Sequence, residues 1–207
     1  LFLSTVEIYG ENRGDLDKFT EDYCGYIDCN TLRAGYPEGK RASESLCQAY
    51  IQKYGIDVVI PRISRTFGPT MLLSDSKASS QFIMNAVHKE NIVLKSAGTQ
   101  LYSYAYVADI VSALLFLLVK GQKGEAYNVS NEHCDITLRT FAETLANVAG
   151  TKVIHGEATA QEKQGFSKAT KALLDNQKIY ALGWRPLYDS MEEPLKHTIK
   201  ILEGSGN

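Results

Sequence analysis

The hydrophobic positions of the chain alternate between short apolar runs and longer stretches with helical spacing. Residues 1–3 and 56–63 are apolar runs, which predict two buried strands. Residues 36–54 between them carry apolar side chains at helical spacing, which predicts a helix that ends at Gly55. Helix, glycine and strand in this order are typical of an α/β protein.

The remainder of the chain continues this alternation. Further helices are predicted over residues 79–89, from Asp109 to about Val119, from Thr137 to Gly150, from Asp175 to Gly183, and from Ser190 onward. Asp109 is expected to cap its helix, and Ser190 with Glu193 three residues later forms a capping box for the last one. Short strands are predicted over residues 92–94 and 126–129, and the polar residues 11–33 are predicted as a loop.

Composition and charge exclude several classes of protein. A chain of 207 residues with 44% hydrophobic content can bury the core of one domain or slightly more. Its formal net charge of -2 offers no basic face to a nucleic acid. The longest apolar stretch, residues 110–119, is too short to span a bilayer and is predicted as a buried helix. We therefore expect neither a nucleic acid nor a membrane as a partner.

The four cysteines, at positions 24, 29, 47 and 134, show no metal-binding pattern. No pair has CxxC spacing, and His133 beside Cys134 has no second pair of ligands to complete a zinc site. Scattered thiols of this kind are usually small core residues of an intracellular protein. We expect no bound metal and a reducing compartment, the cytoplasm.

A dinucleotide-binding opening is not found in the chain. Such an opening needs closely spaced glycines after a first strand, so that a pyrophosphate can approach a helix N-terminus. The early glycines, at positions 10, 14, 25, 35 and 39, form neither GxGxxG nor GxxGxxG after a strand. The chain also begins within an apolar run and without a methionine. We expect it to lack the part that holds a dinucleotide, and to bind one weakly by itself.

Tyr36 and Lys40 are the first candidate catalytic pair. They stand four residues apart at the start of a predicted helix, so their side chains lie one above the other. A tyrosine is a poor base at neutral pH, but an adjacent ammonium group favours the phenolate. The pair could therefore act as a general base on an alcohol. The same YxxxK pattern also recurs by chance on many helices, as a half-buried tyrosine beside a solvated lysine.

Several further motifs follow one another in a fixed order. They are Ser4-Thr5-Val6-Glu7-Ile8-Tyr9-Gly10, then Tyr36 with Lys40, Arg62-Ile63-Ser64-Arg65-Thr66-Phe67-Gly68-Pro69, Tyr106-Val107-Ala108-Asp109 and Leu182-Gly183-Trp184. This succession, which covers essentially the whole chain, resembles the extended short-chain dehydrogenase/reductases of the NAD-dependent epimerase/dehydratase family. The segment from Tyr36 to Cys47 most resembles the UDP-glucuronate decarboxylase branch. Ser4-Thr5-x-Glu7 is shared with the dTDP-glucose 4,6-dehydratases.

The resemblance implies a fold and a set of partners. The expected fold is the C-terminal portion of a Rossmann-like NAD(P)-binding α/β fold with a small mixed α/β substrate lobe. Residues 1–68 and 101–130 would belong to the Rossmann-like part, and residues 69–100 and 131–207 to the lobe. The implied cofactor is NAD, whose glycine-rich loop is absent from this chain, and the implied substrate is a nucleotide sugar. A homodimer that packs through the Tyr36 helix is typical of the family.

The resemblance also implies roles for individual residues. Tyr36 would take the proton from a sugar hydroxyl while hydride passes to NAD, and Lys40 would hold the nicotinamide ribose and keep Tyr36 ionised. Thr5 would hydrogen-bond the same sugar oxygen. Glu7 would be the second group, which directs the keto-sugar towards decarboxylation, elimination or epimerisation. Thr66 would lie near the nicotinamide.

Three positions depart from the family pattern. Val6 replaces an Asp or Ser, and valine cannot donate a proton, so a dehydratase-type elimination would lose its usual acid. Arg65 stands where an Asn is usual, and Tyr102 where an Arg usually helps to hold the substrate. Arg65 and Tyr102 are therefore candidate substrate-binding residues, with the cation moved from one position to the other. A non-catalytic relative that binds a sugar nucleotide or a protein, and a plain oxidoreductase, stay open as alternatives.

Overall fold

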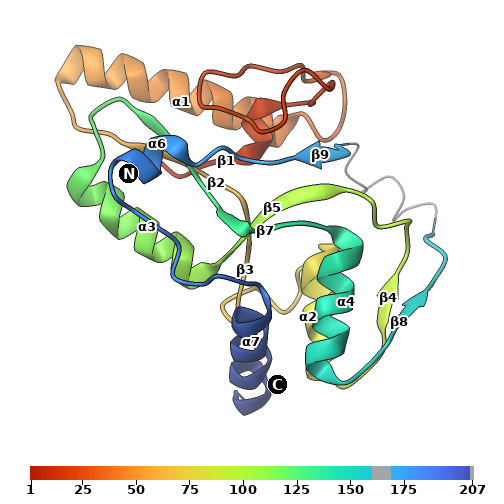
Figure 1. Cartoon of the computed structure of the whole chain (residues 1–207). Coiled ribbons are helices and arrows are strands. Elements are labelled where there is room, and N and C mark those ends of the chain that lie inside the picture. The colour runs from red at the N-terminus through yellow and green to blue at the C-terminus, as the bar shows by residue number, and fades with distance from the viewer. Residues whose placement is uncertain (160–168, 206–207) are drawn as a thin grey trace.

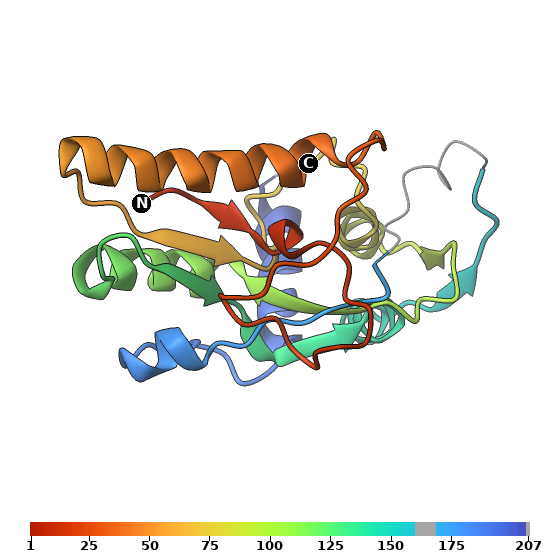
Figure 2. The same ribbon diagram turned by 90° about the horizontal axis from the view of Figure 1, so that it is seen from above.

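A parallel three-stranded sheet forms one side of the molecule. The computed structural model describes residues 1–159 and 169–205. Strands β1 (Ser4–Thr5), β2 (Ile60–Ile63) and β6 (Ala126–Val129) pair in that order. Helix α1 (Gly35–Tyr54) lies over one face of this sheet and α3 (Val107–Lys120) over the other, as Figures 1 and 2 show. This strand–helix alternation is the α/β arrangement that the sequence predicts.

The core between α3 and the sheet is apolar. Its buried side chains come from α3, β6 and the short helix α6 (Gln177–Ala181), together with Val59, Ala105 and Trp184. Among them Ala113 and Val129 are fully enclosed. Burial of this kind, at roughly 25 cal/mol per Å² of apolar surface, holds α3 on the sheet.

A second sheet forms the other side of the molecule. Strand β5 (Leu101–Tyr106) pairs in parallel with β3 (Arg65–Phe67) and β9 (Lys171–Ala172), and antiparallel with β7 (Asn131–Thr137). Helices α2 (Ala78–Val87), α4 (Leu138–Ala149) and α7 (Glu192–Gly204) pack together against its aromatic side chains. A small parallel pair, β4 (Ile92–Leu94) with β8 (Val153–His155), lies beyond α4 (Figure 1).

Capping residues in the sequence account for several helix boundaries. Gly55 adopts a left-handed conformation and its N–H bonds to the Ile51 carbonyl at 2.9 Å, which ends α1 where the sequence predicts. Thr137 caps α4 by accepting the Thr140 N–H at 3.0 Å, and Gly150 ends that helix. These two predicted helices are confirmed.

Two predicted caps are wrong. Helix α3 begins at Val107, so Asp109 lies inside its first turn. The Asp109 carboxylate is fully buried and accepts the Leu187 N–H at 2.6 Å and the Asn131 amide at 3.0 Å. Helix α7 begins after Met191, and no side chain caps it. In both cases the tertiary contacts of the segment, and not the residue type that favours a cap, decide where the helix begins.

The strands were predicted less completely than the helices. The first strand occupies residues 4–5 instead of 1–3, and a short 3-10 helix, η1 (Val6–Tyr9), follows it directly. Strands β5 and β7 were not predicted: β5 alternates through Tyr102, Tyr104 and Tyr106, which face the core, and the polar β7 carries few apolar residues to mark it. The division of the chain into a Rossmann-like part and a lobe stays a prediction, and β5 forms its pairs in the second sheet.

Within residues 1–159 and 169–205, no helix combines the length and the apolar character needed to cross a lipid bilayer.

Gly10 allows two chain segments to approach closely. Its φ is 73°, and a Cβ at this position would clash with the backbone carbonyl oxygen of Tyr26. Gly14 has a φ of 87°, but a Cβ there would meet nothing within 4 Å. Comparing substitutions at the two glycines therefore distinguishes the cost of a positive φ from the added cost of a steric clash.

We predict that Gly10→Ala lowers the free energy of unfolding more than Gly14→Ala does. Both variants incur a positive-φ backbone cost of roughly 1–3 kcal/mol, and only Gly10→Ala adds an overpacking cost of about 1–3 kcal/mol. Urea denaturation of the two variants measures the difference. Equal losses would contradict the close approach of residues 10 and 26.

The buried Asp109 predicts a pH dependence of stability. Burial raises the pKa of its carboxyl above 3.8, although hydrogen bonds from Leu187 and Asn131 oppose the shift. The folded state therefore binds more protons than the unfolded state in the window between 3.8 and the raised pKa. The contribution of Asp109 to the free energy of unfolding falls as the pH rises through this window.

We predict that Asp109→Asn makes stability less dependent on pH in that window. Asn keeps the shape of the side chain and cannot ionise, so its contribution does not fall. Urea denaturation at a series of pH values from 4 upward measures the slope, with exposed Asp57→Asn as the matched control. A slope identical to that of the unmodified chain would contradict this account of Asp109.

Candidate functional site

The carboxyl ends of β1 and β2 define one edge of the parallel sheet. Thr5 in β1 lies directly opposite Ile63 in β2, so the segments that follow the two strands leave the sheet side by side. Glu7 lies in the first of these segments, and Arg65 with Thr66 in the second. In open α/β sheets this edge is where ligands bind, because strand ends leave a crevice there.

Tyr36 and Lys40 lie on the first two turns of α1, beside β1. The Lys40 Nζ is 5.9 Å from the centre of the Tyr36 ring and donates to the Leu3 carbonyl oxygen at 2.8 Å. Tyr36 is 56% exposed, and its hydroxyl has no hydrogen-bond partner among the described residues. The structure thus brings the predicted pair together and joins it to the residue that precedes β1.

Thr5 and Glu7 occupy the turn at the end of β1. The buried Thr5 caps η1, and its Oγ1 accepts the Glu7 N–H at 3.3 Å. The Thr5 hydroxyl hydrogen is then left to donate elsewhere. The Glu7 side chain is half-buried, and its carboxylate accepts no hydrogen bond from the described residues.

Arg65 and Tyr102 are in direct contact. The Arg65 guanidinium carbon lies 3.7 Å from the centre of the Tyr102 ring, which is a cation–π geometry. The Tyr102 hydroxyl donates to the Ala169 carbonyl at 2.8 Å and so fixes the ring. Burial raises the pKa of neighbouring Tyr104 to about 12, against the effect of Arg65. No carboxylate of the described residues pairs with Arg65, whose N–H groups are therefore available to an anion.

Thr66 stands apart from the other predicted site residues. It is exposed in β3, and its hydroxyl donates to the Ser64 carbonyl at 3.3 Å. No hydrogen bond or ring contact among the described residues joins it to Tyr36 or Lys40. Its predicted role beside a cofactor stays a prediction.

The sequence reasoning missed a buried polar network beneath the site. Arg62 in β2 donates to both carboxylate oxygens of Glu44, from Nε at 3.1 Å and from Nη2 at 2.7 Å. Its Nη1 donates to the Tyr9 hydroxyl at 3.0 Å and to the Glu21 carbonyl at 2.6 Å. The Tyr9 hydroxyl in turn donates to Asn128 at 2.6 Å.

Burial and hydrogen bonding shift the pKa values of this network. Burial raises the pKa of Tyr9, so its hydroxyl stays protonated and can donate. Burial alone would lower the pKa of Arg62, but its bonds to Glu44 and Tyr9 raise it. A sequence signal for the network existed, because an arginine inside a short apolar strand needs a buried anion. Glu44 is four residues beyond Lys40, on the same face of α1.

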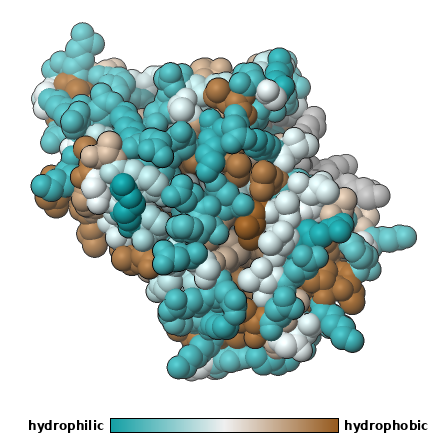
Figure 3. Space-filling model, in the orientation of Figure 1, coloured by the Kyte–Doolittle hydropathy of each residue, from teal (hydrophilic) through white to brown (hydrophobic). Residues whose placement is uncertain are grey.

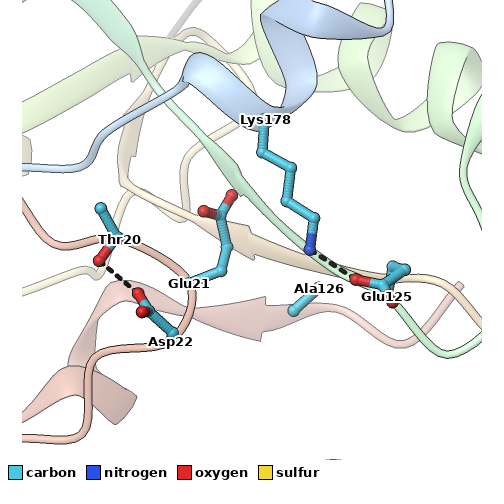
Figure 4. Close-up of a pocket in the computed structure, with 6 residues that line it drawn as sticks. All are labelled: Thr20, Glu21, Asp22, Glu125, Ala126 and Lys178. Atoms are coloured by element: carbon cyan, nitrogen blue, oxygen red, sulfur yellow. Dashed lines mark hydrogen bonds and ion pairs between the residues drawn. The ribbon is translucent and has the colours of Figure 1, made fainter.

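A cavity of about 410 Å³ borders this network at Glu21 (Figure 4). It is lined by Thr20, Glu21, Asp22, Glu125, Ala126 and Lys178. Its charged groups are largely satisfied by their neighbours, since Lys178 pairs with Glu125 at 2.7 Å and Glu21 accepts the Asn128 N–H at 2.8 Å. Across the described residues, no group of three His, Cys, Asp or Glu side chains is arranged to hold a metal ion.

Comparison with known sequences gives a family match. The model of the NAD dependent epimerase/dehydratase family matches residues 1–130. UDP-glucuronic acid decarboxylase 1 of Xenopus tropicalis is 32% identical over 213 residues, which cover 100% of this chain and 48% of that protein. UDP-glucuronic acid decarboxylase 6 of Arabidopsis thaliana is 32% identical over 90% of this chain and 52% of its own length. The chain spans about half the length of these curated relatives.

Comparison with solved structures supports the fold. UDP-glucose 4-epimerase of Thermotoga maritima, solved with UDP-glucose, superposes with a TM-score of 0.84 at 22% identity, over 100% of this chain and 63% of that one. The dTDP-glucose 4,6-dehydratase of Bacillus anthracis, solved with NAD, gives a TM-score of 0.79 at 22% identity, over 98% and 60%. The predicted Rossmann-like α/β class is confirmed.

Proposed function

The chain belongs to the NAD dependent epimerase/dehydratase family, and on this basis we propose that it is the active-site part of an enzyme that modifies a nucleotide sugar with NAD. The reaction class is decarboxylation, epimerisation or dehydration through a keto-sugar. The observation that carries the proposal is the bond from Lys40 to the Leu3 carbonyl. It holds the Tyr36–Lys40 pair beside the strand end that bears Thr5 and Glu7.

The described residues fit a bound NAD at this edge. The Tyr36 hydroxyl has no partner among them, and the Lys40 ammonium lies beside its ring. Tyr36, Lys40 and Thr66 would hold the cofactor, which when bound accepts a hydride from the sugar and can return it. A glycine-rich unit outside this chain would hold the pyrophosphate.

Tyr36, Thr5 and Glu7 have separate roles in the proton transfers. Tyr36, as a phenolate, takes the proton of a sugar hydroxyl while the carbon that bears this hydroxyl is oxidised to a ketone. The positive charge of Lys40 favours the phenolate form of Tyr36. The Thr5 hydroxyl donates to the same sugar oxygen, since its own oxygen already accepts from Glu7. The ketone withdraws electrons from the neighbouring carbon, so that a carboxylate there can leave as CO2 or a proton there can be removed. Glu7 serves as the second group in that step.

The edge of β1 supports the addition of further strands. Among the described strands, β1 pairs only with β2, so its other edge can accept a strand of a nucleotide-binding βαβ unit. The exposed side of α3 carries an apolar stripe of Val111, Leu115, Leu118 and Val119. Figure 3 shows hydrophobic atoms on the α3 side of a largely hydrophilic face. In this proposal residues 1–68 and 101–130 complete the Rossmann-like domain, and residues 69–100 and 131–207 form the substrate lobe.

The proposal includes a homodimer in the cytoplasm. The outward face of α1 exposes Leu46, Tyr50 and Tyr54, which are 59%, 53% and 59% accessible. A second copy of α1 would cover these side chains, as is typical of the family. All four cysteines are free thiols, which agrees with a reducing compartment.

Arg65 and Tyr102 would hold the substrate diphosphate. Stacking on the Tyr102 ring orients the guanidinium, and its N–H groups match phosphate oxygens in a planar fork. Such an anchor compensates for the Asn and Arg that the family usually has at positions 65 and 102.

We predict that Tyr36→Phe in the full-length protein lowers turnover of its nucleotide sugar by about 10²–10⁴-fold with little change in NAD affinity. The variant keeps the ring and loses only the proton acceptor. Mass spectrometry of UDP-, dTDP-, GDP- and CDP-sugars incubated with NAD identifies the substrate, by loss of CO2 or water or by isomerisation. Tyr26→Phe, which removes an exposed hydroxyl outside α1 and its outward face, is the matched control.

Undiminished turnover by Tyr36→Phe would remove Tyr36 from its proposed role. A full-length protein that binds a sugar nucleotide but converts none of those tested would instead support the non-catalytic alternative.

We predict that Arg65→Ala weakens binding of UDP or dTDP by about 10- to 100-fold, from the loss of charge-assisted hydrogen bonds. Tyr102→Phe keeps the ring beneath the guanidinium and loses only its bond to the Ala169 carbonyl, so its loss of affinity should be smaller than that of Arg65→Ala. Isothermal titration of each variant with the nucleoside diphosphate, and with the nucleoside that lacks the diphosphate, measures the effect. Unchanged affinity in Arg65→Ala would rule out the anchor.

A further inference from the structure

Helix α1 contacts the sheet through polar side chains. Of its residues only Pro37 is buried, whereas Leu46, Tyr50 and Tyr54 point to solvent. Three polar residues four positions apart contact the segments next to the strands, and Arg41 on the same helix donates to the Ile8 carbonyl at 2.6 Å and to the Gly25 carbonyl at 2.7 Å. Lys40 donates to the Leu3 carbonyl at 2.8 Å, Glu44 accepts from Arg62, and Gln48 donates to the Gly124 carbonyl at 2.7 Å.

This polar stripe determines the rotation of α1. Interlocking apolar side chains usually fix how a helix sits on its neighbours, and α1 has few of them. Hydrogen bonds have strict distance and angle requirements, so they can fix the same rotation. Tyr36, Lys40 and Glu44 share one face of the helix, because they are spaced by four residues.

Arg62 of β2 connects several of these segments. Its guanidinium binds Glu44 through two parallel bonds, and it also holds Tyr9 of η1 and the carbonyl of Glu21. In Figure 2, α1 runs along the whole sheet, and its N-terminal end lies nearest the end of β1, where η1 follows. Arg62, together with Arg41, therefore links the helix that carries Tyr36 to the turn that carries Glu7.

The pair is shielded from solvent. The side chains of Arg62 and Glu44 are 11% and 12% exposed. Exposed ion pairs contribute little to the free energy of unfolding, whereas the loss of one member of a buried pair leaves an uncompensated charge in the protein interior. The Arg62–Glu44 pair therefore constrains the relative position of β2 and α1 more than an exposed salt bridge would.

We infer that Glu44 and Arg62 are positioning residues, which hold Tyr36 and Lys40 in register with Thr5 and Glu7. This inference rests on the proposed function. A small rotation of α1 would move Tyr36 away from the sugar hydroxyl while leaving the nucleotide-binding residues of the lobe in place. Displacements of about 1 Å can lower a rate by about 10²-fold.

The first test is Glu44→Gln in the full-length protein. One carboxylate oxygen becomes an NH2 group that opposes the guanidinium N–H groups. We predict that kcat falls by about 10- to 100-fold, whereas KM for the nucleotide sugar and the affinity for NAD change little. Hydrogen exchange should accelerate in residues 36–54 and stay unchanged in α4. Glu143→Gln, at an exposed site on α4, is the matched control.

A double variant separates positioning from stability. Glu44→Leu with Arg62→Met removes both buried charges together, so we expect its Tm to lie above that of Glu44→Leu alone, although the Tyr9 hydroxyl and the Glu21 carbonyl lose their donor. Because the apolar pair lacks directional bonds, kcat should stay low. Recovery of kcat together with Tm, or normal kcat in Glu44→Gln, would overturn the inference.

The outcome for Tyr36→Phe keeps the two proposals distinct. If Tyr36→Phe is inactive and Glu44→Gln is fully active, only the positioning role fails. If Tyr36→Phe is fully active, the proposed function itself fails, whatever the hydrogen exchange of α1 shows.

Discussion

The Arg62 guanidinium joins segments that are far apart in the sequence. It lies in β2, binds Glu44 of α1 and Tyr9 of η1, and reaches the backbone at Glu21. A buried charge of this kind requires every partner, because a missing acceptor would leave part of it unsatisfied. The long loop between η1 and α1, the helix and the sheet are consequently held in one arrangement, and the carboxyl edge of the sheet depends on it.

The candidate site follows from this arrangement. Parallel pairing of β1 with β2 sets Thr5 opposite Ile63, and Lys40 joins α1 to the residue before β1. Acid–base chemistry needs such groups in fixed relative positions, since proton transfer depends steeply on geometry. The second sheet adds Arg65 stacked on Tyr102 beside the same edge. The two halves of the proposed reaction, proton transfer and substrate anchoring, thus come from different sheets.

Helix α1 reverses the usual amphipathic pattern. Its polar side chains contact the sheet and its apolar side chains face outward, so periodicity alone identifies the helix but not the face that it buries. The outward face needs a cover, and a second copy of the chain supplies one in the proposed dimer. One face of α1 would then position the candidate site residues, and the opposite face would form the dimer interface.

The sequence by itself determined the α/β class, the helices that end at Gly55 and Gly150, and the family that the motifs around Thr5, Tyr36 and Arg65 resemble. These features depend on local conformation and on residue order along the chain. Only the tertiary structure decided that Asp109 binds Leu187 instead of capping α3, and that Arg62 binds Glu44. Only it set the pairing of β5 with β7 and the contact of Arg65 with Tyr102. These contacts join distant residues, so the sequence can indicate that an arginine in an apolar strand needs a buried anion, but not which residue supplies it.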